Sequence, residues 1–138
     1  MNILAMSGFV QTLTDKTLSN EVSWKSLYDL QTTTKENNKF LFTTLFQDEF
    51  HTINFPNSFY CLNNSSGYVY LINETFESGY DGSVISGPNI YIQKDALSMV
   101  HKLTVELGQI YQLQNAILYS KEQDNEEIQD FIDNFYKQ

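Results

Sequence analysis

The sequence predicts an α+β fold, in which a small antiparallel β-sheet is packed by an N-terminal helix and by C-terminal amphipathic helices. Apolar residues recur with a period of two between residues 40 and 93, and with helical spacing in the last third of the chain. A length of 138 residues with 41% hydrophobic residues is typical of one domain with a buried core. We therefore expect a single domain over residues 1–138, with a sheet of about four strands in residues 40–93.

The first third of the chain gives a mixed signal. Residues 3–13 are apolar, and their pattern does not distinguish a strand from a short helix. Ser19 or Ser23 is a candidate N-cap for a helix that carries Trp24 and Leu27 and ends at three consecutive threonines. The polar residues that follow, 35–39, predict a loop.

The middle of the chain carries the strand signals. Residues 40–46 alternate and predict a strand with apolar groups on both faces. The β-prone residues 59–62 and 68–72 flank an Asn/Ser/Gly sequence, which predicts a β-hairpin. Residues 89–93 predict a further strand. The segment before it, residues 73–88, is rich in glycine and acidic residues and predicts a long loop.

The last third returns to helical spacing. Apolar residues recur every three or four positions from Ala96 to Ile117, which predicts one long helix, or two joined near Lys102, with Asp95 as N-cap. A final helix is expected to follow Asp124 or Asn125. Its apolar residues fall on one face and its acidic residues on the other. The apolar set is Ile128, Phe131, Ile132, Phe135 and Tyr136, and the acidic set is Glu126, Glu127, Asp130 and Asp133.

The residue inventory argues against catalysis. His51 and His101 are the only histidines, and Cys61 is the only cysteine. The chain contains no zinc-binding HExxH motif, no phosphate-binding glycine loop and no calcium-binding loop. His51 follows two acidic residues, so a carboxylate–histidine pair could act there as a base or metal ligand, but a surface histidine at a strand end is the simpler interpretation. We expect no enzyme activity, no cofactor and no metal site.

Three features of the sequence bear on the cellular compartment. A lone cysteine favours a reducing, intracellular setting. The N-terminus lacks the basic segment of a signal peptide, and no apolar stretch reaches the ~20 residues that span a bilayer. The sequence therefore predicts a cytoplasmic protein without a membrane segment.

The charge balance points to a class of partner. The net charge is −9, and all eight basic residues are lysines. Nucleic-acid binding relies on clustered positive charge and on arginine, so no direct nucleic-acid ligand is expected. Residues 121–138 hold six acids and two lysines, a net charge of −4. Such a face is either the solvated side of an amphipathic helix or a surface that steers the chain toward a basic protein.

These observations favour a small, acidic, non-catalytic inhibitor that binds and occludes a basic protein partner, such as a nuclease or toxin. This is the role of toxin-immunity and phage anti-defence proteins. The expected partner-binding residues are acids for steering and tyrosines as interface anchors. They are Glu74, Glu77, Asp81, Glu127 and Asp130, with Tyr68 and Tyr80. The alternatives are an oligomeric module that sequesters a small molecule in an aromatic-lined pocket, and a structural subunit of a larger assembly; a homodimer fits either.

One partial resemblance bears on this choice. Glu49 is followed by Phe55-Pro56, by the Asn-rich turn at residues 63–67 and by the closing helix at Ile128. This succession resembles that of a class of bacterial toxin-immunity domains, with phenylalanine in place of leucine and without their double glycine. The resemblance implies an immunity function.

Overall fold

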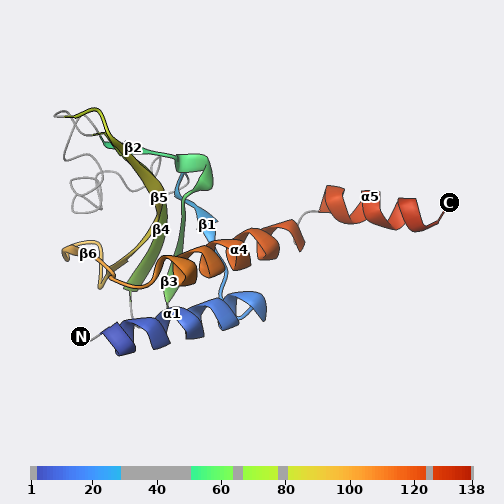
Figure 1. The fold of residues 1–138 in the computed structure, drawn as a ribbon. Coiled ribbons are helices and arrows are strands. Elements are labelled where there is room, and N and C mark those ends of the chain that lie inside the picture. The colour runs from blue at the N-terminus through green and yellow to red at the C-terminus, as the bar shows by residue number, and fades with distance from the viewer. Residues whose placement is uncertain (1–2, 29–50, 64–66, 78–80, 124–125, 138) are drawn as a thin grey trace. The chain divides into compact units, whose positions relative to one another are not determined.

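The computed structural model describes residues 3–28, 51–63, 67–77, 81–123 and 126–137 (Figure 1). The chain divides into two compact units. The helical unit comprises Met1–Ser23 and Glu106–Gln138, and the sheet unit comprises Trp24–Val105. Helices and an antiparallel sheet that are separate along the chain confirm the α+β class. That residues 1–138 form one domain stays a prediction.

The sheet unit is a six-stranded antiparallel sheet. Its strands are β1 (Lys25–Ser26), β2 (His51–Ile53), β3 (Phe59–Asn63), β4 (Gly67–Glu77), β5 (Val84–Gln93) and β6 (Val100–Lys102), with a short 3-10 helix η1 (Phe55–Asn57) between β2 and β3. The spatial order is β1-β3-β4-β5-β6, and β2 pairs with β4. The sheet has more strands than the sequence indicates, because β1, β2 and β6 are only two or three residues long.

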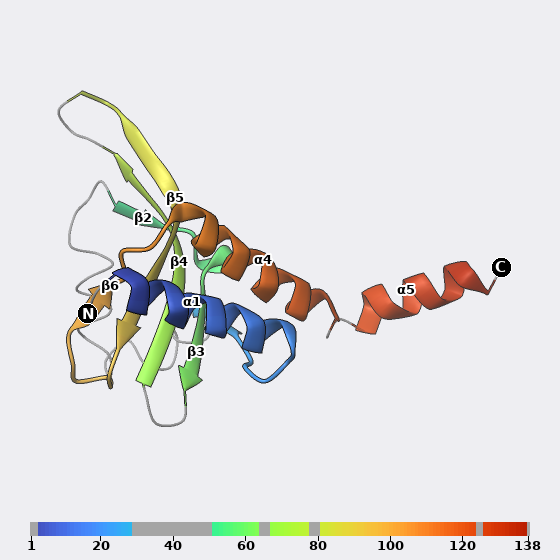
Figure 2. The ribbon, with the colours of Figure 1, turned by 60° about the horizontal axis from the view of Figure 1, so that its bottom comes forward.

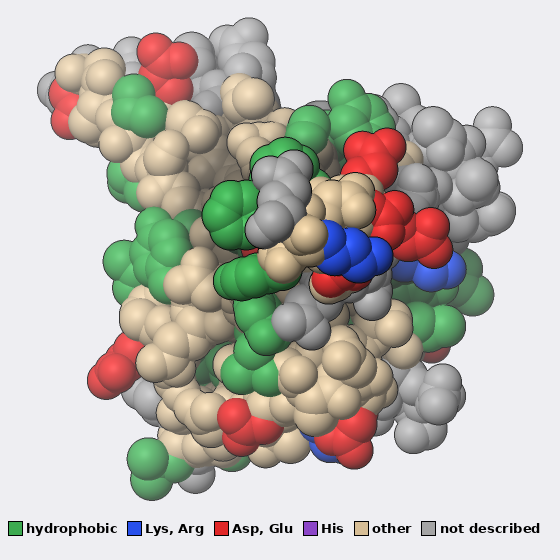
Figure 3. Space-filling model, turned by 90° about the vertical axis from the view of Figure 1, so that its right-hand side faces the viewer, with side chains coloured by type: hydrophobic (Ala, Val, Ile, Leu, Met, Phe, Trp, Pro, Cys, Tyr) green, Lys and Arg blue, Asp and Glu red, His purple; other side chains and the backbone are tan. Residues whose placement is uncertain are grey.

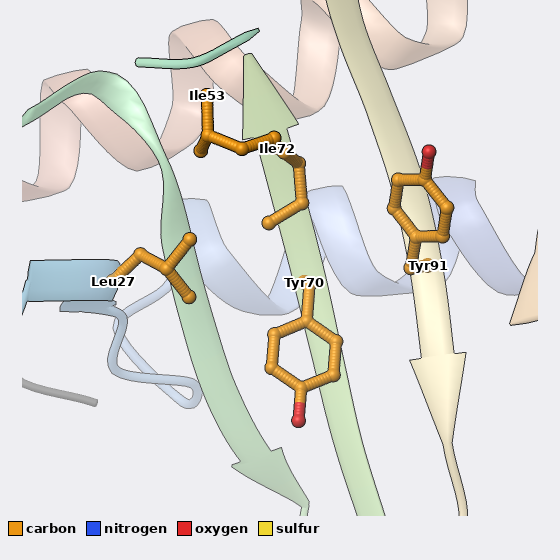
Figure 4. Packing of buried hydrophobic residues seen from close by; sticks show 5 residues of the cluster. All are labelled: Leu27, Ile53, Tyr70, Ile72 and Tyr91. Carbon is orange, nitrogen blue, oxygen red and sulfur yellow. The ribbon is translucent and has the colours of Figure 1, made fainter. Parts of the chain in front are cut away.

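The long strand β4 organises this sheet. It pairs with β5 over ten residues, from Tyr68↔Gln93 to Glu77↔Val84. Because side chains alternate between the two faces of a strand, Tyr70 and Ile72 share a face. They form a buried cluster there with Leu27, Ile53 and Tyr91 (Figure 4).

The predicted hairpin is confirmed as β3 and β4, although its loop residues 64–66 lie outside the described residues. Gly67 begins β4 with a φ of +86°. A Cβ at this position would lie 2.2 Å from the carbonyl oxygen of Gln93 and 2.3 Å from that of Lys94. Glycine is therefore required both by backbone conformation and by the close approach of β5.

The helical unit contains α1 (Ile3–Leu18), α4 (Leu107–Gln123) and α5 (Glu126–Tyr136). Helices α1 and α4 lie side by side (Figure 2). Val10 of α1 and Leu113 of α4 are fully buried. The Ser7 hydroxyl donates to Gln109 Oε1 at 3.0 Å and links the two helices near the start of each.

The ambiguous segment 3–13 is helical and continues to Leu18. The helix predicted to start at Ser19 or Ser23 is wrong as placed, because these residues follow the end of α1. Asn20 has a φ of +62°, and the Glu21 amide donates to the Lys16 carbonyl at 2.9 Å, so the chain closes α1 there. Strand β1 comes next. Only Leu27 and Tyr28 are helical, and the rest of the predicted helix lies outside the described residues, as do the predicted loop 35–39 and strand 40–46.

Two further predictions are corrected in the second half of the chain. Residues 96–105 are not helical: Asp95 closes a turn, and β6 pairs with β5. The turn and strand use apolar residues whose spacing also fits a helix. Residues 73–88 are not a long loop, because β4 continues to Glu77 and β5 begins at Val84. The final helix is confirmed as α5.

Candidate functional site

Helix α5 carries large apolar side chains that are exposed in the described structure. Phe131 is 74% exposed and Phe135 is 65% exposed, whereas Leu113 of α4 is fully buried. None of the residues of α5 is buried. The exposed large apolar residues of this helix are Ile128, Phe131, Ile132, Phe135 and Tyr136.

The opposite side of α5 is acidic. Glu126 and Glu127 occupy the first turn, where the partial positive charge of the helix N-terminus stabilises carboxylates. Asp130 and Asp133 follow at helical spacing, and Gln129 Nε2 donates to Asp133 Oδ1 at 3.0 Å. Figure 3 shows hydrophobic and acidic side chains exposed on one face of the molecule. The helix is therefore strongly amphipathic, although none of its residues is buried.

The predicted partner-binding residues fall on both units. Glu127 and Asp130 are exposed on α5, in the helical unit. Glu77 and Asp81 are exposed near the β4–β5 connection in the sheet unit, where Asp81 Oδ1 accepts from the Ser83 amide at 2.9 Å. Tyr68 is half-buried and stacks on Tyr70 with ring centroids 5.9 Å apart. Tyr80 lies outside the described residues.

The placement of Glu74 in an exposed loop is wrong. It lies in β4 and is only 3% exposed. The sequence contains a signal for this, because Tyr70, Ile72 and Glu74 share one face of an alternating strand. Glu74 is therefore a buried residue of the sheet and not a surface charge that could attract a partner.

A buried polar network surrounds the Glu74 carboxylate. His51 Nε2 lies 2.8 Å from Oε1, and Asn89 Nδ2 donates to Oε2 at 3.1 Å. The Tyr91 hydroxyl donates to Oε2 at 2.7 Å and to Oε1 at 3.0 Å. The His51 ring stacks on Phe76 with centroids 4.1 Å apart. The carboxylate that pairs with His51 thus comes from β4. The two acids that precede the histidine, Asp48 and Glu49, lie outside the described residues.

This network satisfies the carboxylate but leaves part of the histidine unpaired. His51 Nδ1 is buried and has no hydrogen-bond partner among the described residues. Burial raises the pKa of the Tyr91 hydroxyl, and the neighbouring Glu74 raises it further, so this hydroxyl remains a donor. Within the described part of the chain, no three His, Cys, Asp or Glu side chains are grouped to hold a metal ion. The arrangement is suited to fixing β2 and β5 against β4.

The class defined by these features is an α+β protein in which an exposed amphipathic helix, α5, follows α4. No protein-family model, curated protein sequence or solved structure matches the chain. The partial resemblance to immunity domains is therefore not supported by a family match. Among the described helices, none is both long enough and apolar enough to cross a membrane.

Proposed function

We propose that this protein is a non-catalytic inhibitor that binds a basic protein partner through α5 and occludes the partner's working surface. The observation that carries the proposal is the exposed apolar face of α5, on which no residue is buried. Large exposed apolar patches are typical of interaction sites, since their hydration is unfavourable. A helix that lays its apolar face into a groove is a recurrent mode of recognition.

The apolar spacing on α5 fits this mode. Ile128, Ile132 and Phe135 follow at intervals of four and three, and Phe131 with Phe135 adds a second pair on the same face. Aromatic side chains often dominate interface energetics because they bury large areas at low entropic cost. Phe131 and Phe135 are therefore the proposed anchors.

Charge complementarity supports a basic protein as the occupant. The 11 residues of α5 contain four acids and no lysine, and the chain carries a net charge of −9. A groove edged by lysine or arginine would be attracted to this helix, whereas a second copy or an anionic membrane would be repelled. Nucleases and many toxins that act on nucleic acid have such basic surfaces, so an immunity or anti-defence role is the narrower form of this proposal.

The test is affinity capture of the tagged full chain from its native source, at low and high salt, compared across two variants. Phe131→Ala with Phe135→Ala removes the anchors. Asn134→Ala is the matched control, because it changes a polar residue of the same helix. Polylysine beads report attraction by charge alone.

We expect a basic protein that is retained by the wild type and by Asn134→Ala, lost with the double variant, and weakened at high salt. The double variant should still bind polylysine. Capture of the same proteins by the wild type and the double variant would overturn the proposed role of α5, and a partner without a basic surface would overturn the charge argument.

A further inference from the structure

A second exposed apolar surface lies in the sheet unit, on the connection between β5 and β6. Leu97 is 82% exposed and Met99 is 59% exposed. Together with Ile92 they line a pocket of about 590 Å³. Binding sites for small molecules commonly have this volume and predominantly apolar walls.

This pocket is also locally basic in an acidic protein. Lys94 and His101 line it, beside the aliphatic residues. Residues 94–102 contain two lysines and one aspartate, a net charge of +1, whereas the whole chain carries −9. Among the described residues, no carboxylate forms an ion pair with Lys94. The pocket thus combines aliphatic walls with an uncompensated cation.

Hydrogen bonds fix the turn that presents these residues. Asp95 Oδ1 accepts from the Leu97 amide and from the Ser98 hydroxyl, both at 2.9 Å. Gln93 is buried, and its Nε2 donates to the Ser98 carbonyl at 2.9 Å. The Tyr70 hydroxyl in turn donates to Gln93 Oε1 at 2.7 Å. The exposed apolar side chains are therefore held on a preorganised turn, which lowers the entropic cost of binding a ligand.

We propose that this pocket binds an aliphatic monocarboxylate. The hydrocarbon chain lies against Ile92, Leu97 and Met99, and the carboxylate lies near Lys94 and His101. A single negative charge matches the single lysine of the pocket. A polyphosphate would need more positive charge, and the chain contains no arginine fork to supply it.

The test uses the full chain with ¹³C-methyl methionine, titrated with decanoate below its micelle concentration. Met99 lines the pocket, and Met6 in α1 is the internal control. Decanol keeps the chain without the charge, and acetate keeps the charge without the chain. We expect saturable shifts at Met99 and none at Met6, with decanol about fivefold weaker because one charge contact is lost and no saturation by acetate.

Two pairs of variants locate the site. Leu97→Ser should weaken decanoate binding about tenfold, whereas Leu4→Ser, which changes an equally exposed leucine outside the pocket, should not. Lys94→Gln should remove the preference for decanoate over decanol, whereas Lys25→Gln should keep it.

Three outcomes would overturn the proposal. The first is the absence of saturable shifts at Met99. The second is equal affinity for decanoate and decanol in the wild type. The third is binding that survives Leu97→Ser but disappears with Phe131→Ala, since this would place the ligand on α5. None of these outcomes bears on capture of a protein by α5, so the two proposals fail separately.

Discussion

The Glu74 carboxylate shows how single residues determine the sheet unit. It is buried and receives hydrogen bonds from Tyr91 and Asn89, and it pairs with His51. Burying a carboxylate without such donors is strongly unfavourable. The four residues come from β2, β4 and β5, so this one side chain ties three strands together.

Glu74→Gln should lower the free energy of unfolding by about 1–3 kcal/mol, because an amide NH₂ would face groups that are themselves donors. Urea unfolding at neutral pH measures this loss. Glu77→Gln is the matched control, since it alters an exposed acid of the same strand, and it should change stability by less than about 0.5 kcal/mol. Equal effects of the two substitutions would contradict the structural role of the network.

The lone thiol gives a prediction with a defined pH dependence. Burial raises the pKa of Cys61 to about 12, partly opposed by a backbone hydrogen bond with Val69. Because the thiolate is the reactive form, the folded protein should react with Ellman's reagent at pH 8 far more slowly than the urea-unfolded chain does. Equal rates in the two states would rule out the buried, protonated thiol.

The same pKa shift makes the free energy of unfolding depend on pH. In the unfolded chain the thiol ionises near its ordinary value of 9.0. Between pH 9 and pH 12 the unfolded state binds fewer protons than the folded state, so stability falls as pH rises through this window. Tyr91 acts in the same direction above pH 10. The Cys61→Ala variant should therefore lose less stability than the wild type between pH 8.5 and 10.5.

Alanine substitutions at two of the glycines should change the free energy of unfolding in opposite directions. Gly67→Ala should lower stability by about 2 kcal/mol or more, because the residue has a positive φ and the new Cβ would collide with backbone carbonyls. Gly8→Ala in α1 meets nothing within 4 Å and should raise stability by about 0.5–1 kcal/mol, since alanine favours the helix. Thermal unfolding of the two variants tests both signs; a neutral Gly67→Ala would contradict the close approach of β5.

Two helices with a similar amphipathic pattern differ in whether their apolar faces are buried. Helices α4 and α5 both carry apolar residues at helical spacing, yet α4 buries Ile110, Leu113 and Ile117, whereas α5 buries none. The pattern predicts which face of a helix is apolar, but not whether another element covers it. That difference makes α5 the candidate interface.

Phe131→Ala should therefore leave the free energy of unfolding within about 0.5 kcal/mol of the wild type, while it weakens partner capture. Leu113→Ala should cost about 2–5 kcal/mol, because it opens a cavity in a packed core. Urea denaturation of the two variants makes the comparison. A large loss of stability with Phe131→Ala would show that the α5 face is packed in solution and would contradict its assignment as a free interface.

The strand predictions show which elements a sequence specifies locally. The β3–β4 hairpin follows from two β-prone runs around an Asn/Ser/Gly turn, and α5 follows from its period. Strand β6 is not predicted from the sequence, because a strand of three residues carries little periodicity. The outer part of β5 is predicted as a loop, because it contains Gly87 and Pro88; both segments gain their hydrogen bonds from a neighbouring strand. The position of Glu74 in the core likewise depends on its pairing with β2 and β5.

Charge is a property of the whole molecule. With a net charge of −9, the chain should associate with a basic partner faster than an uncharged protein would, and this advantage should fall with salt. The acids of α5 lie on the same helix as the proposed anchors.

Replacing these four acids by their amides should slow association with the captured partner by about tenfold or more at low salt, and should leave a rate that depends little on salt. The replaced residues are Glu126, Glu127, Asp130 and Asp133. Stopped-flow or surface plasmon resonance measures the rates, with circular dichroism to confirm that α5 stays helical. The control replaces Glu77 and Asp81, which are exposed in the sheet unit. The control removes two charges and the α5 variant removes four. A fall in the logarithm of the rate in proportion to the charges removed would therefore assign the steering to net charge rather than to α5.

The sequence by itself determined the α+β class, the central hairpin, the amphipathic α5 and the acidity of the chain, because these depend on local periodicity, turn residues and composition. Only the tertiary structure decided that Glu74 is a core residue, that residues 96–105 form a turn and a strand, and that the apolar residues of α5 are exposed. These outcomes depend on which segments pair across long sequence separations. Local pattern specifies the faces that an element offers, whereas burial and hydrogen bonding are settled by the neighbours that meet them.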